Sequence, residues 1–418
     1  MEPPQEVPPY FKITKNKTYF QDFKSQKLFD LIYYDAFGAH SQPEIWEPQL
    51  MIKCYKLLKP GGVWTSYCAK GSDRRGLQNA GFTVYRLPGS PGKREMLRAI
   101  NSNCLFLKKK LMKILITGAT GLLGRSLVNV ALSKGIQINF LTTKKTKINC
   151  LNNAIGFYWN PSNGDLDMNC FSGVDIIIHL AGASISKPWT SSYRKLIFSS
   201  RVDSTRLLFS SLKRIRSSHQ VKQIISASAI GIYSSDFEKT FSEKAKVYPD
   251  SFMEEVVIAW ENEVDSFTSI NIKVAKMRIG LILSNDGGVL GPLKIPTAFG
   301  LGAAFGNGKQ GQSWIHILDV IGIFLKACNE QWEGIYNAVS PNPVSQTYFI
   351  EALAKALKRP YFLPPVPKIL LKILVGKMSS LVLDSHWISA QKVIDKKYKF
   401  LYPEINTAMI NIIDNSLE

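Results

Sequence analysis

The clearest chemical signal in the sequence is a set of three glycines, Gly118, Gly121 and Gly124, spaced three positions apart. Between a strand and a helix, such glycines permit a tight turn, close approach to a pyrophosphate and close helix packing. The N-terminus of the following helix also favours bound anions. The pattern predicts a dinucleotide-binding turn made by Gly118, Thr120, Gly121, Leu122, Leu123 and Gly124.

The segment expected beside the adenosine ribose carries hydroxyls and cations. The glycine turn follows a buried strand expected over 113–117, and a second strand, expected over 137–141, ends in Thr142-Thr143-Lys144-Lys145. Enzymes that use NAD usually place Asp or Glu there for the ribose 2′-hydroxyl. Because hydroxyls and cations suit a 2′-phosphate instead, we expect NADP(H) bound by Thr143 and Lys144. The alternative is that these lysines lie in a solvated loop.

Small residues follow a third apolar run at 174–180, which is expected to form another buried strand. Leu180, Ala181, Gly182 and Ala183 would let the cofactor lie against the backbone. His179 lies inside the apolar run, so we expect a core histidine with satisfied ring nitrogens, not a catalytic group.

Hydroxyl groups follow a fourth strand, expected over 223–225. The strand continues into Ser226-Ala227-Ser228-Ala229, and Tyr233 comes shortly afterwards. Serines at the carboxyl end of a sheet strand point into the ligand crevice of this α/β architecture. Ser228 and Tyr233 are therefore candidate catalytic residues.

Residues 112 to about 415 resemble the YfcH-like epimerase family, an atypical branch of the extended short-chain dehydrogenases. The matching segments are ITGATGLLG, HLAGASISKPWT, SSRVDSTRLL, SASAIGIY, RIGLILSNDGG, GQSWIHILD and YNAVSPNPV, and the tail at 383–401 matches as well. The resemblance implies a doubly wound parallel α/β sheet of the Rossmann type that binds NADP(H) over 112–345. It also implies a small C-terminal substrate lobe over 346–418.

The usual catalytic pair of short-chain dehydrogenases is missing. In that pair, Tyr-xxx-Lys, the lysine lowers the tyrosine pKa so that the phenol can exchange a proton with substrate. The only such spacing here is Tyr55 to Lys59, upstream of the nucleotide fold, and the helix expected at 252–261 has no such pair. Glu243 is a candidate replacement carboxylate, with a solvated loop charge as the alternative.

Three residues in segments that resemble the family are candidates for substrate binding: Arg278, Trp314 and His316. Arg278, at a strand end, could grip an anionic group or form a structural pair. The stretch at 312–316 resembles the crevice-lining segment of the family, and His316 could pair with Asp319 or face the ligand.

The first 107 residues have the layout of a partial Rossmann-like methyltransferase, separated from the second domain by a basic linker at 108–111. A strand ends at Asp35, and a helix follows at 48–57 with Lys-Pro-Gly-Gly before the next strand. The segments YYDAFGAHSQPEIW, LLKPGGVWTSYCAKGSDRRGLQNAGF and RLPGSPGKREMLRA resemble the MnmC-like methyltransferase domain. That family completes 5-methylaminomethyl-uridine at the tRNA wobble position.

This resemblance implies that Asp35 would accept hydrogen bonds from the amine being methylated. Lys70, Arg74, Arg75, Lys93 and Arg94 would be candidates for phosphate contacts with tRNA, or else a solvated basic face. Residues 1–26 contain no glycine, so they cannot supply a Gly-rich loop for S-adenosylmethionine. We expect S-adenosylmethionine not to bind this module and the module to be inactive by itself.

Composition indicates an ordinary globular protein with a basic surface. The net charge is +20, and residues 1–110 hold 18 Lys/Arg against 9 Asp/Glu. Six scattered cysteines, without a CxxC pair or Cys/His cluster, argue against disulfides and metal sites and fit a reducing cytoplasm. The N-terminus does not resemble a signal peptide, and the apolar stretch at 369–383 is too short and charged for a bilayer span.

Three functions remain open at this level. The first is an NADP(H)-dependent oxidoreductase or epimerase-like enzyme acting on a small molecule. The second is a non-catalytic protein that binds or senses NADP(H), which the missing Tyr-xxx-Lys pair favours. The third is a tRNA-modification protein that docks tRNA through residues 1–107.

Overall fold

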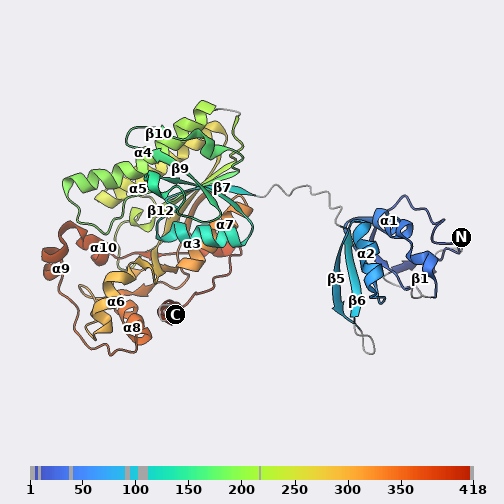
Figure 1. Ribbon diagram of the computed structural model, residues 1–418. Helices are drawn as coiled ribbons and strands as arrows, with labels where there is room; N and C mark the ends of the chain where they lie inside the picture. Colours follow the sequence, from blue (N-terminus) through green and yellow to red (C-terminus); the bar gives the residue numbers. More distant parts are fainter. Residues whose placement is uncertain are drawn as a thin grey trace. The chain divides into compact units, whose positions relative to one another are not determined.

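The computed structural model describes residues 5–7, 11–36, 41–89, 95–101, 112–215 and 218–414. The chain divides into two compact units, Met1–Lys110 and Leu111–Glu418 (Figure 1). The division falls within the linker predicted at 108–111, and each unit contains its own hydrophobic core.

The larger unit is built on an eight-stranded sheet in the order β10-β9-β8-β7-β11-β12-β14-β19. All neighbours pair in parallel except β10, which is antiparallel to β9. The order reverses between β7 and β11, and this is where an open α/β sheet binds its ligand. The strands are β7 (Lys113–Thr117), β8 (Gln137–Thr142), β9 (Ala154–Asn160), β10 (Asp165–Leu166), β11 (Ile176–His179), β12 (Gln223–Ala229), β14 (Lys273–Ile279) and β19 (Gly334–Ala338).

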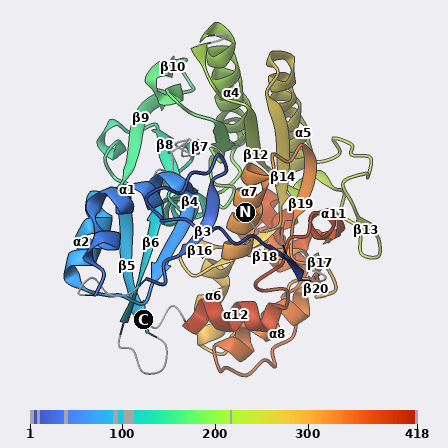
Figure 2. The ribbon, with the colours of Figure 1, turned by 90° about the vertical axis from the view of Figure 1, so that its right-hand side faces the viewer.

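Helices cover both faces of this sheet because its central strands are apolar on both sides. Ile114 and Ile116 pack with α3 (Leu122–Ser133) and α7 (Ile317–Asn329) in one core cluster. Leu115, between them, joins the opposite cluster with α4 (Ser191–Ile215) and α5 (Phe252–Asp265). Helices α4 and α5 lie side by side (Figure 2). Such two-sided burial is typical of parallel sheets and confirms the predicted Rossmann-type class.

A smaller lobe combines two separated stretches of chain. Residues of β15 (Leu281–Ser284), α6 (Leu290–Ala298) and β18 (Trp314–His316) share a core with α8 (Gln346–Ala356) and α12 (Ile405–Asp414). The lobe therefore includes residues from before 346, which the predicted boundary did not anticipate. The remaining short elements of this unit are η2 (Lys145–Lys147), η3 (Met168–Phe171), η5 (Ile230–Ile232), β13 (Thr240–Phe241), η6 (Ser266–Ile270), β16 (Gly287–Gly288), β17 (Gly311–Gln312), β20 (Val344–Ser345), α9 (Lys368–Val375), η7 (Gly376–Ser379), α10 (Ser380–Leu383), β21 (Trp387–Ile388) and α11 (Gln391–Asp395).

The first unit contains a four-stranded sheet in the order β3-β4-β6-β5. Strands β3 and β4 are parallel, and β6 is antiparallel to both of its neighbours. The elements are β1 (Gln5–Val7), β2 (Phe11–Ile13), β3 (Phe29–Tyr33), η1 (Pro43–Trp46), α1 (Pro48–Leu57), β4 (Leu58–Ser66), α2 (Gly71–Asn79), β5 (Phe82–Pro88) and β6 (Glu95–Asn101). The strand–helix–strand order is the one that the sequence predicts for this half-domain.

Within the described ranges, no helix is both long and apolar enough to cross a membrane.

Candidate functional site

The glycine turn between β7 and α3 leaves no space for side chains at two of its three glycines. A β-carbon at Gly118, whose φ is +67°, would lie 2.7 Å from the carbonyl oxygen of Leu180. A β-carbon at Gly124 would lie 2.2 Å from the Gly118 carbonyl oxygen. Gly121 precedes the first residue of α3, and its amide donates to the Gly118 carbonyl oxygen at 3.0 Å. The turn thus has the close-packed backbone that a dinucleotide pyrophosphate requires.

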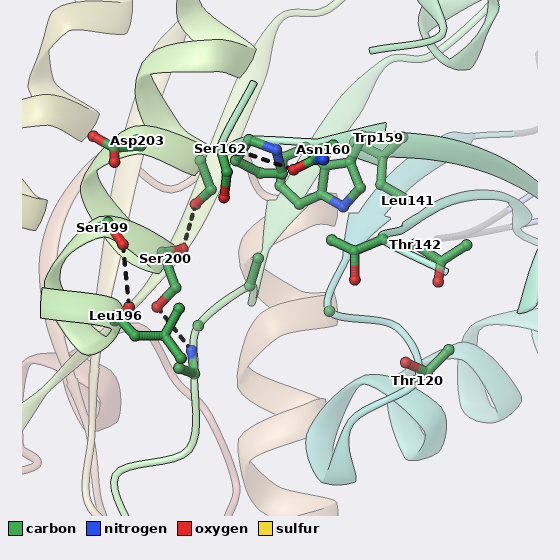
Figure 3. Close-up of a pocket in the computed structure, with 17 residues that line it drawn as sticks. Thr120, Leu141, Thr142, Trp159, Asn160, Ser162, Leu196, Ser199, Ser200 and Asp203 are labelled. Atoms are coloured by element: carbon green, nitrogen blue, oxygen red, sulfur yellow. Dashed lines mark hydrogen bonds between the residues drawn. The ribbon is translucent and has the colours of Figure 1, made fainter. Parts of the chain in front are cut away.

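A cavity of about 430 Å³ opens next to this turn at the carboxyl edge of the sheet. We call it the first cavity. Figure 3 shows Thr120 facing residues of α4 across it, with Trp159 and Asn160 at the end of β9. Its lining includes the predicted Gly118, Thr120, Thr143, Ala181, Gly182 and Ala183, together with Leu141, Thr142, Trp159, Asn160, Pro161, Ser162, Leu196, Ser199, Ser200, Asp203 and Ser204.

The other predicted cofactor residues lie behind or beside this lining. Leu123 is a buried residue of α3, and Gly121, Leu122 and Gly124 belong to the turn and the first helical residues beside the cavity. Lys144 is exposed in the loop after β8, and its amide donates to the Thr142 hydroxyl at 3.3 Å.

The loop after β11 is held by two hydroxyls and a guanidinium that the sequence patterns did not single out. Thr117 Oγ accepts hydrogen bonds from the amides of Leu180 and Ala181, both at 3.0 Å. On the other side, the Ala183 amide donates to Ser200 Oγ at 2.9 Å, and the Arg201 guanidinium donates to the Ala183 carbonyl oxygen at 3.2 Å. Ser200 and Arg201 lie in the SSRVDSTRLL segment, and Thr117 ends the strand before the glycine turn. Only the folded contacts show that these three side chains hold the loop.

His179 has the structural role that the sequence predicts. Its Nδ1 lies 2.8 Å from the Thr117 hydroxyl, and its Nε2 lies 3.0 Å from the Thr205 hydroxyl. The ring is fully buried, and burial lowers the His179 pKa to about 3. A neutral imidazole with both nitrogens engaged connects β7, β11 and α4.

A second cavity of about 360 Å³ lies farther along the same loop. Residues 181–183 line the first cavity, whereas Ile185 and Trp189 line the second. The second cavity is bounded by the end of β12, the start of α5, residues 279–281, residues 311–313 and the segment after α9. Its lining comprises Ile185, Trp189, Ala229, Ile230, Gly231, Tyr233, Ser235, Ser251, Phe252, Met253, Glu254, Ile279, Gly280, Leu281, Gly311, Gln312, Ser313, Ser380, Leu381, Asp384 and His386.

Two predicted functional residues, Ser228 and Arg278, belong instead to a buried ionic network. Arg278 forms two hydrogen bonds with the Glu261 carboxylate, at 2.8 Å and 2.9 Å. The Ser228 hydroxyl donates to the same carboxylate at 2.6 Å. Neither Ser228 nor Arg278 lines the second cavity, and both are at most 4% exposed. The structure therefore gives both residues partners inside the protein, and of the two alternatives for Arg278 the structural pair is the one observed.

Tyr233 lines the second cavity, but its hydroxyl is held in the same network. Arg278 Nη1 donates to the Tyr233 hydroxyl at 2.9 Å, and this hydroxyl donates to Asn337 Oδ1 at 2.8 Å. Burial raises the pKa of Tyr233, and the nearby Arg278 lowers it by less. The phenol is thus a weaker acid than an ordinary tyrosine and stays protonated, unlike the tyrosine of a Tyr-xxx-Lys pair, whose pKa is lowered.

Three other candidates also have internal partners. Glu243 Oε1 accepts a hydrogen bond from the backbone amide of Asn337 at 2.7 Å, so the Glu243 carboxylate is not merely solvated. Trp314 is buried in the lobe core and donates to the Asn342 carbonyl oxygen at 3.0 Å. His316 accepts from the Leu318 amide at 3.1 Å at the start of α7, and its ring lies 4.0 Å from that of Tyr402. Trp314 and His316 do not line the second cavity, so their predicted substrate contact has no support from it.

In the first unit, Asp35 is exposed just after β3, at the carboxyl edge of that strand. The Tyr33 ring packs edge-on against that of Tyr67, and the hydrogen bond between their side chains is the main reason that the Tyr33 pKa rises to about 12. Lys70 precedes the first residue of α2, and Arg74 and Arg75 lie on that helix. Lys93 and Arg94 lie outside the described residues, as does part of the predicted Asp-Ala-Phe motif at 35–37.

The reversed strand order and the glycine turn define a Rossmann-type dinucleotide-binding unit. Residues 114–284 match the NAD dependent epimerase/dehydratase family, and residues 366–412 match a domain of unknown function, DUF1731. An epimerase family protein of Staphylococcus saprophyticus is 34% identical over 305 residues, covering 72% of this chain and 98% of the relative. One from Staphylococcus haemolyticus is 33% identical over 308 residues, covering 72% and 99%. The chain therefore belongs to the epimerase family.

Solved structures agree on the fold. A human epimerase family protein, solved with NADPH, has a TM-score of 0.64 at 23% identity over 73% of this chain and 100% of that chain. A nucleoside-diphosphate sugar epimerase from Corynebacterium glutamicum has a TM-score of 0.59 at 23% identity, over 84% of this chain and 74% of that chain. The UDP-glucose 4-epimerase of Thermotoga maritima has a TM-score of 0.60 at 16% identity, over 73% and 100%.

Residues 15–102 match a family of S-adenosyl-L-methionine-dependent methyltransferases. The chain thus combines an N-terminal methyltransferase-like domain with an epimerase-type domain for a nicotinamide cofactor, as the sequence predicts.

Proposed function

We propose that residues 112–418 form an NADP(H)-dependent oxidoreductase or epimerase-like enzyme that acts on a small molecule. The observation that carries this proposal is the succession of two cavities along the loop after β11. A dinucleotide with its pyrophosphate at the glycine turn would place its adenosine end in the first cavity. The nicotinamide end would then reach the second cavity, where a substrate of modest size has room.

The glycine turn fits a dinucleotide on its own geometry. Neighbouring backbone occupies the spaces that β-carbons would fill at Gly118 and Gly124. Because the turn carries no side chains there, its backbone can come close to a bound pyrophosphate. The nicotinamide supplies or accepts a hydride when it is bound. The protein supplies the amide groups at the start of α3 and the walls of the second cavity.

The preference for NADP(H) rests on the residues after β8. Thr142 and Thr143 line the first cavity with hydroxyls, and the exposed Lys144 follows directly. No Asp or Glu occupies the Thr142–Lys145 segment, where a carboxylate would repel a 2′-phosphate. The human relative solved with NADPH agrees with this choice.

Calorimetric titration of the full chain with NADPH and NADH tests the cofactor proposal. We expect one NADPH site and binding of NADPH at least ten times tighter than that of NADH. Equal affinities would contradict the NADP(H) preference, and tight binding without turnover of any substrate would favour the sensor alternative.

A further inference from the structure

The second cavity lacks an evident proton donor once the internal contacts are counted. Ser228 and Arg278 are held by Glu261, and the Tyr233 hydroxyl lies between Arg278 and Asn337. Reduction of a carbonyl group or oxidation of an alcohol needs a group that moves one proton at the reacting oxygen. The remaining titratable side chains among the described lining residues are Glu254, Asp384 and His386.

Two of these three side chains, Glu254 and His386, are poorly suited to transfer a proton to the substrate oxygen. Glu254 is committed to the start of α5, where its carboxylate accepts a hydrogen bond from the Ser251 amide at 2.7 Å. Burial lowers the pKa of His386 to about 4, so its imidazole stays neutral and is a weak base.

Asp384 has a carboxyl group that no other described residue engages in a hydrogen bond and that can exchange a proton in the cavity. It is partly buried in the cavity wall, and in the described part of the chain its carboxylate accepts no hydrogen bond. Burial, and then the negative charge of Glu254, raise the Asp384 pKa to about 6. The lining residues include no lysine or arginine that could hold this carboxyl ionised. It is therefore half protonated near pH 6, and roughly a tenth of it keeps the proton at pH 7, so it can both give and take a proton in this range.

The backbone after Asp384 is held firmly against the Rossmann part of the unit. The Ser385 amide donates to Ser235 Oγ at 2.9 Å, and the His386 amide donates to the Gly311 carbonyl oxygen at 3.0 Å. Strand β21 then pairs in parallel with β13. A segment from the DUF1731 region thus places Asp384 in the cavity wall, and this region has no assigned role.

We propose that Asp384 is the catalytic acid and base of the second cavity, acting on an uncharged carbonyl compound or the corresponding alcohol. This assignment rests on the proposed function. In the reducing direction, hydride from the reduced nicotinamide adds to the carbonyl carbon and the C=O π electrons move to oxygen. That oxygen takes the proton of the Asp384 carboxyl group, which leaves an alcohol, the oxidised dinucleotide and an Asp384 carboxylate. A hydronium ion from the solvent then reprotonates the carboxylate and becomes water, so each turnover consumes one proton.

The charges of the lining indicate why the substrate is uncharged. Glu254 and Asp384 are its charged side chains, and the described lining has no cation. A diphosphate or carboxylate group would therefore meet repulsion from these carboxylates that no cation of the described lining offsets. The lining therefore differs from that expected of a site for a nucleoside-diphosphate sugar, which needs cations for the diphosphate.

The experiment compares the full-length protein with Asp384→Asn and Asp384→Glu, using 4-nitrobenzaldehyde as the neutral probe and 4-nitrobenzoate as its anionic analogue. With NADPH, we expect wild-type protein to reduce the aldehyde with kcat/KM falling above about pH 6. Asp384→Asn should lower kcat by about 100-fold or more without changing the NADPH Kd, and Asp384→Glu should recover part of the rate. The matched control is Asp250→Asn, an exposed loop carboxylate outside the lining, which should leave kcat unchanged.

Two readouts do not depend on turnover. Carboxyl carbon resonances of [4-¹³C]aspartate-labelled protein, assigned with the Asp384→Asn variant, should show Asp384 titrating near pH 6. Calorimetry with saturating NADP⁺ should show binding of the aldehyde but not of the benzoate, and Asp384→Asn should improve benzoate binding at pH 8. Titration of Asp384 in the ordinary aspartate range, or tighter binding of the benzoate than of the aldehyde, would overturn the assignment. Loss of NADPH binding by wild-type protein would instead defeat the proposed function itself.

Discussion

A β-carbon at Gly124 would lie 2.2 Å from the carbonyl oxygen of Gly118, so a side chain at one end of the turn would push apart its other end. Gly124 lies in α3 and Gly118 directly follows β7, and the helix and the strand pack in the same hydrophobic core. The dinucleotide turn and the packing of the sheet therefore depend on the same glycine.

We predict that Gly124→Ala weakens NADPH binding by about 10-fold or more and destabilises the protein by roughly 1–3 kcal/mol through overpacking. Urea unfolding and calorimetry measure the two effects. Gly291→Ala in α6 is the control, because a β-carbon there has open space around it. That substitution should leave NADPH binding unchanged, and equal effects of the two variants would contradict this account of the turn.

Arg278 and Ser228 should act on stability through Glu261. Arg278→Ala removes both guanidinium hydrogen bonds from the buried Glu261 carboxylate and leaves only Lys276 as its cation among the described residues, with Nζ 3.8 Å from Glu261 Oε2. We expect a loss of about 3–5 kcal/mol in the free energy of unfolding. Ser228→Ala should cost about 1.5–3 kcal/mol, because it removes a hydrogen bond to a buried charge. Ser210→Ala on the exposed side of α4 serves as the control, within about 0.5 kcal/mol of wild type. A Ser228→Ala protein of wild-type stability but reduced kcat would restore the catalytic interpretation.

Thr143 should set the choice between the two nicotinamide dinucleotides. A carboxylate at this lining position would repel a 2′-phosphate and accept a hydrogen bond from a 2′-hydroxyl. We predict that Thr143→Glu lowers NADPH affinity by about 10-fold or more and raises that for NADH. Ser133→Glu adds the same charge at the exposed end of α3 and should change neither Kd. An unchanged NADPH Kd in Thr143→Glu would place the 2′-phosphate elsewhere.

Asp384 should reduce stability as the pH rises. Its folded-state pKa, about 6, lies above the ordinary aspartate value, so the folded protein binds the proton more tightly. Stability is then lost between about pH 4 and 6 as the carboxyl ionises in the folded state. Thermal unfolding should show Asp384→Asn gaining roughly 1–2 kcal/mol over wild type at pH 8, after a discount for solvent screening, and less at pH 4. A difference that does not change with pH would contradict the raised pKa.

The tRNA contact proposed for the first unit depends on its cations near α2. Replacing Lys70, Arg74 and Arg75 with alanine should weaken tRNA binding and flatten its salt dependence in filter-binding assays. The control replaces the exposed Lys15, Lys17 and Lys24 with alanine, which removes the same charge from the same unit and should weaken tRNA binding less. If both triple variants weaken binding equally, the contact is non-specific; if wild-type protein does not bind tRNA, the proposal fails.

The sequence predicted those features that local patterns specify. Glycine spacing located the turn, and apolar runs located the strands of the parallel sheet, including the neutral core position of His179. The patterns could not show which polar groups face inward. Ser228 and Arg278 had the right types at strand ends, but Glu261, remote in sequence, binds both.

Asp384, in contrast, lines the second cavity but was not predicted as a functional residue from the sequence. Nothing near it in the sequence signals chemistry, because it enters the cavity wall only when the segment after α10 packs against residues 233–241 and 311–313. Such long-range packing also explains why the lobe core includes Leu283 and Trp314, which precede the predicted boundary.

A crystal structure of the full-length protein grown with NADP⁺ tests the central claim most directly. We predict density for the pyrophosphate at the Gly118–Gly124 turn, for the 2′-phosphate beside Thr143, and for the nicotinamide ring in the cavity that Tyr233 and Asp384 line. A dinucleotide bound away from the turn, or a nicotinamide ring outside the second cavity, would contradict the account.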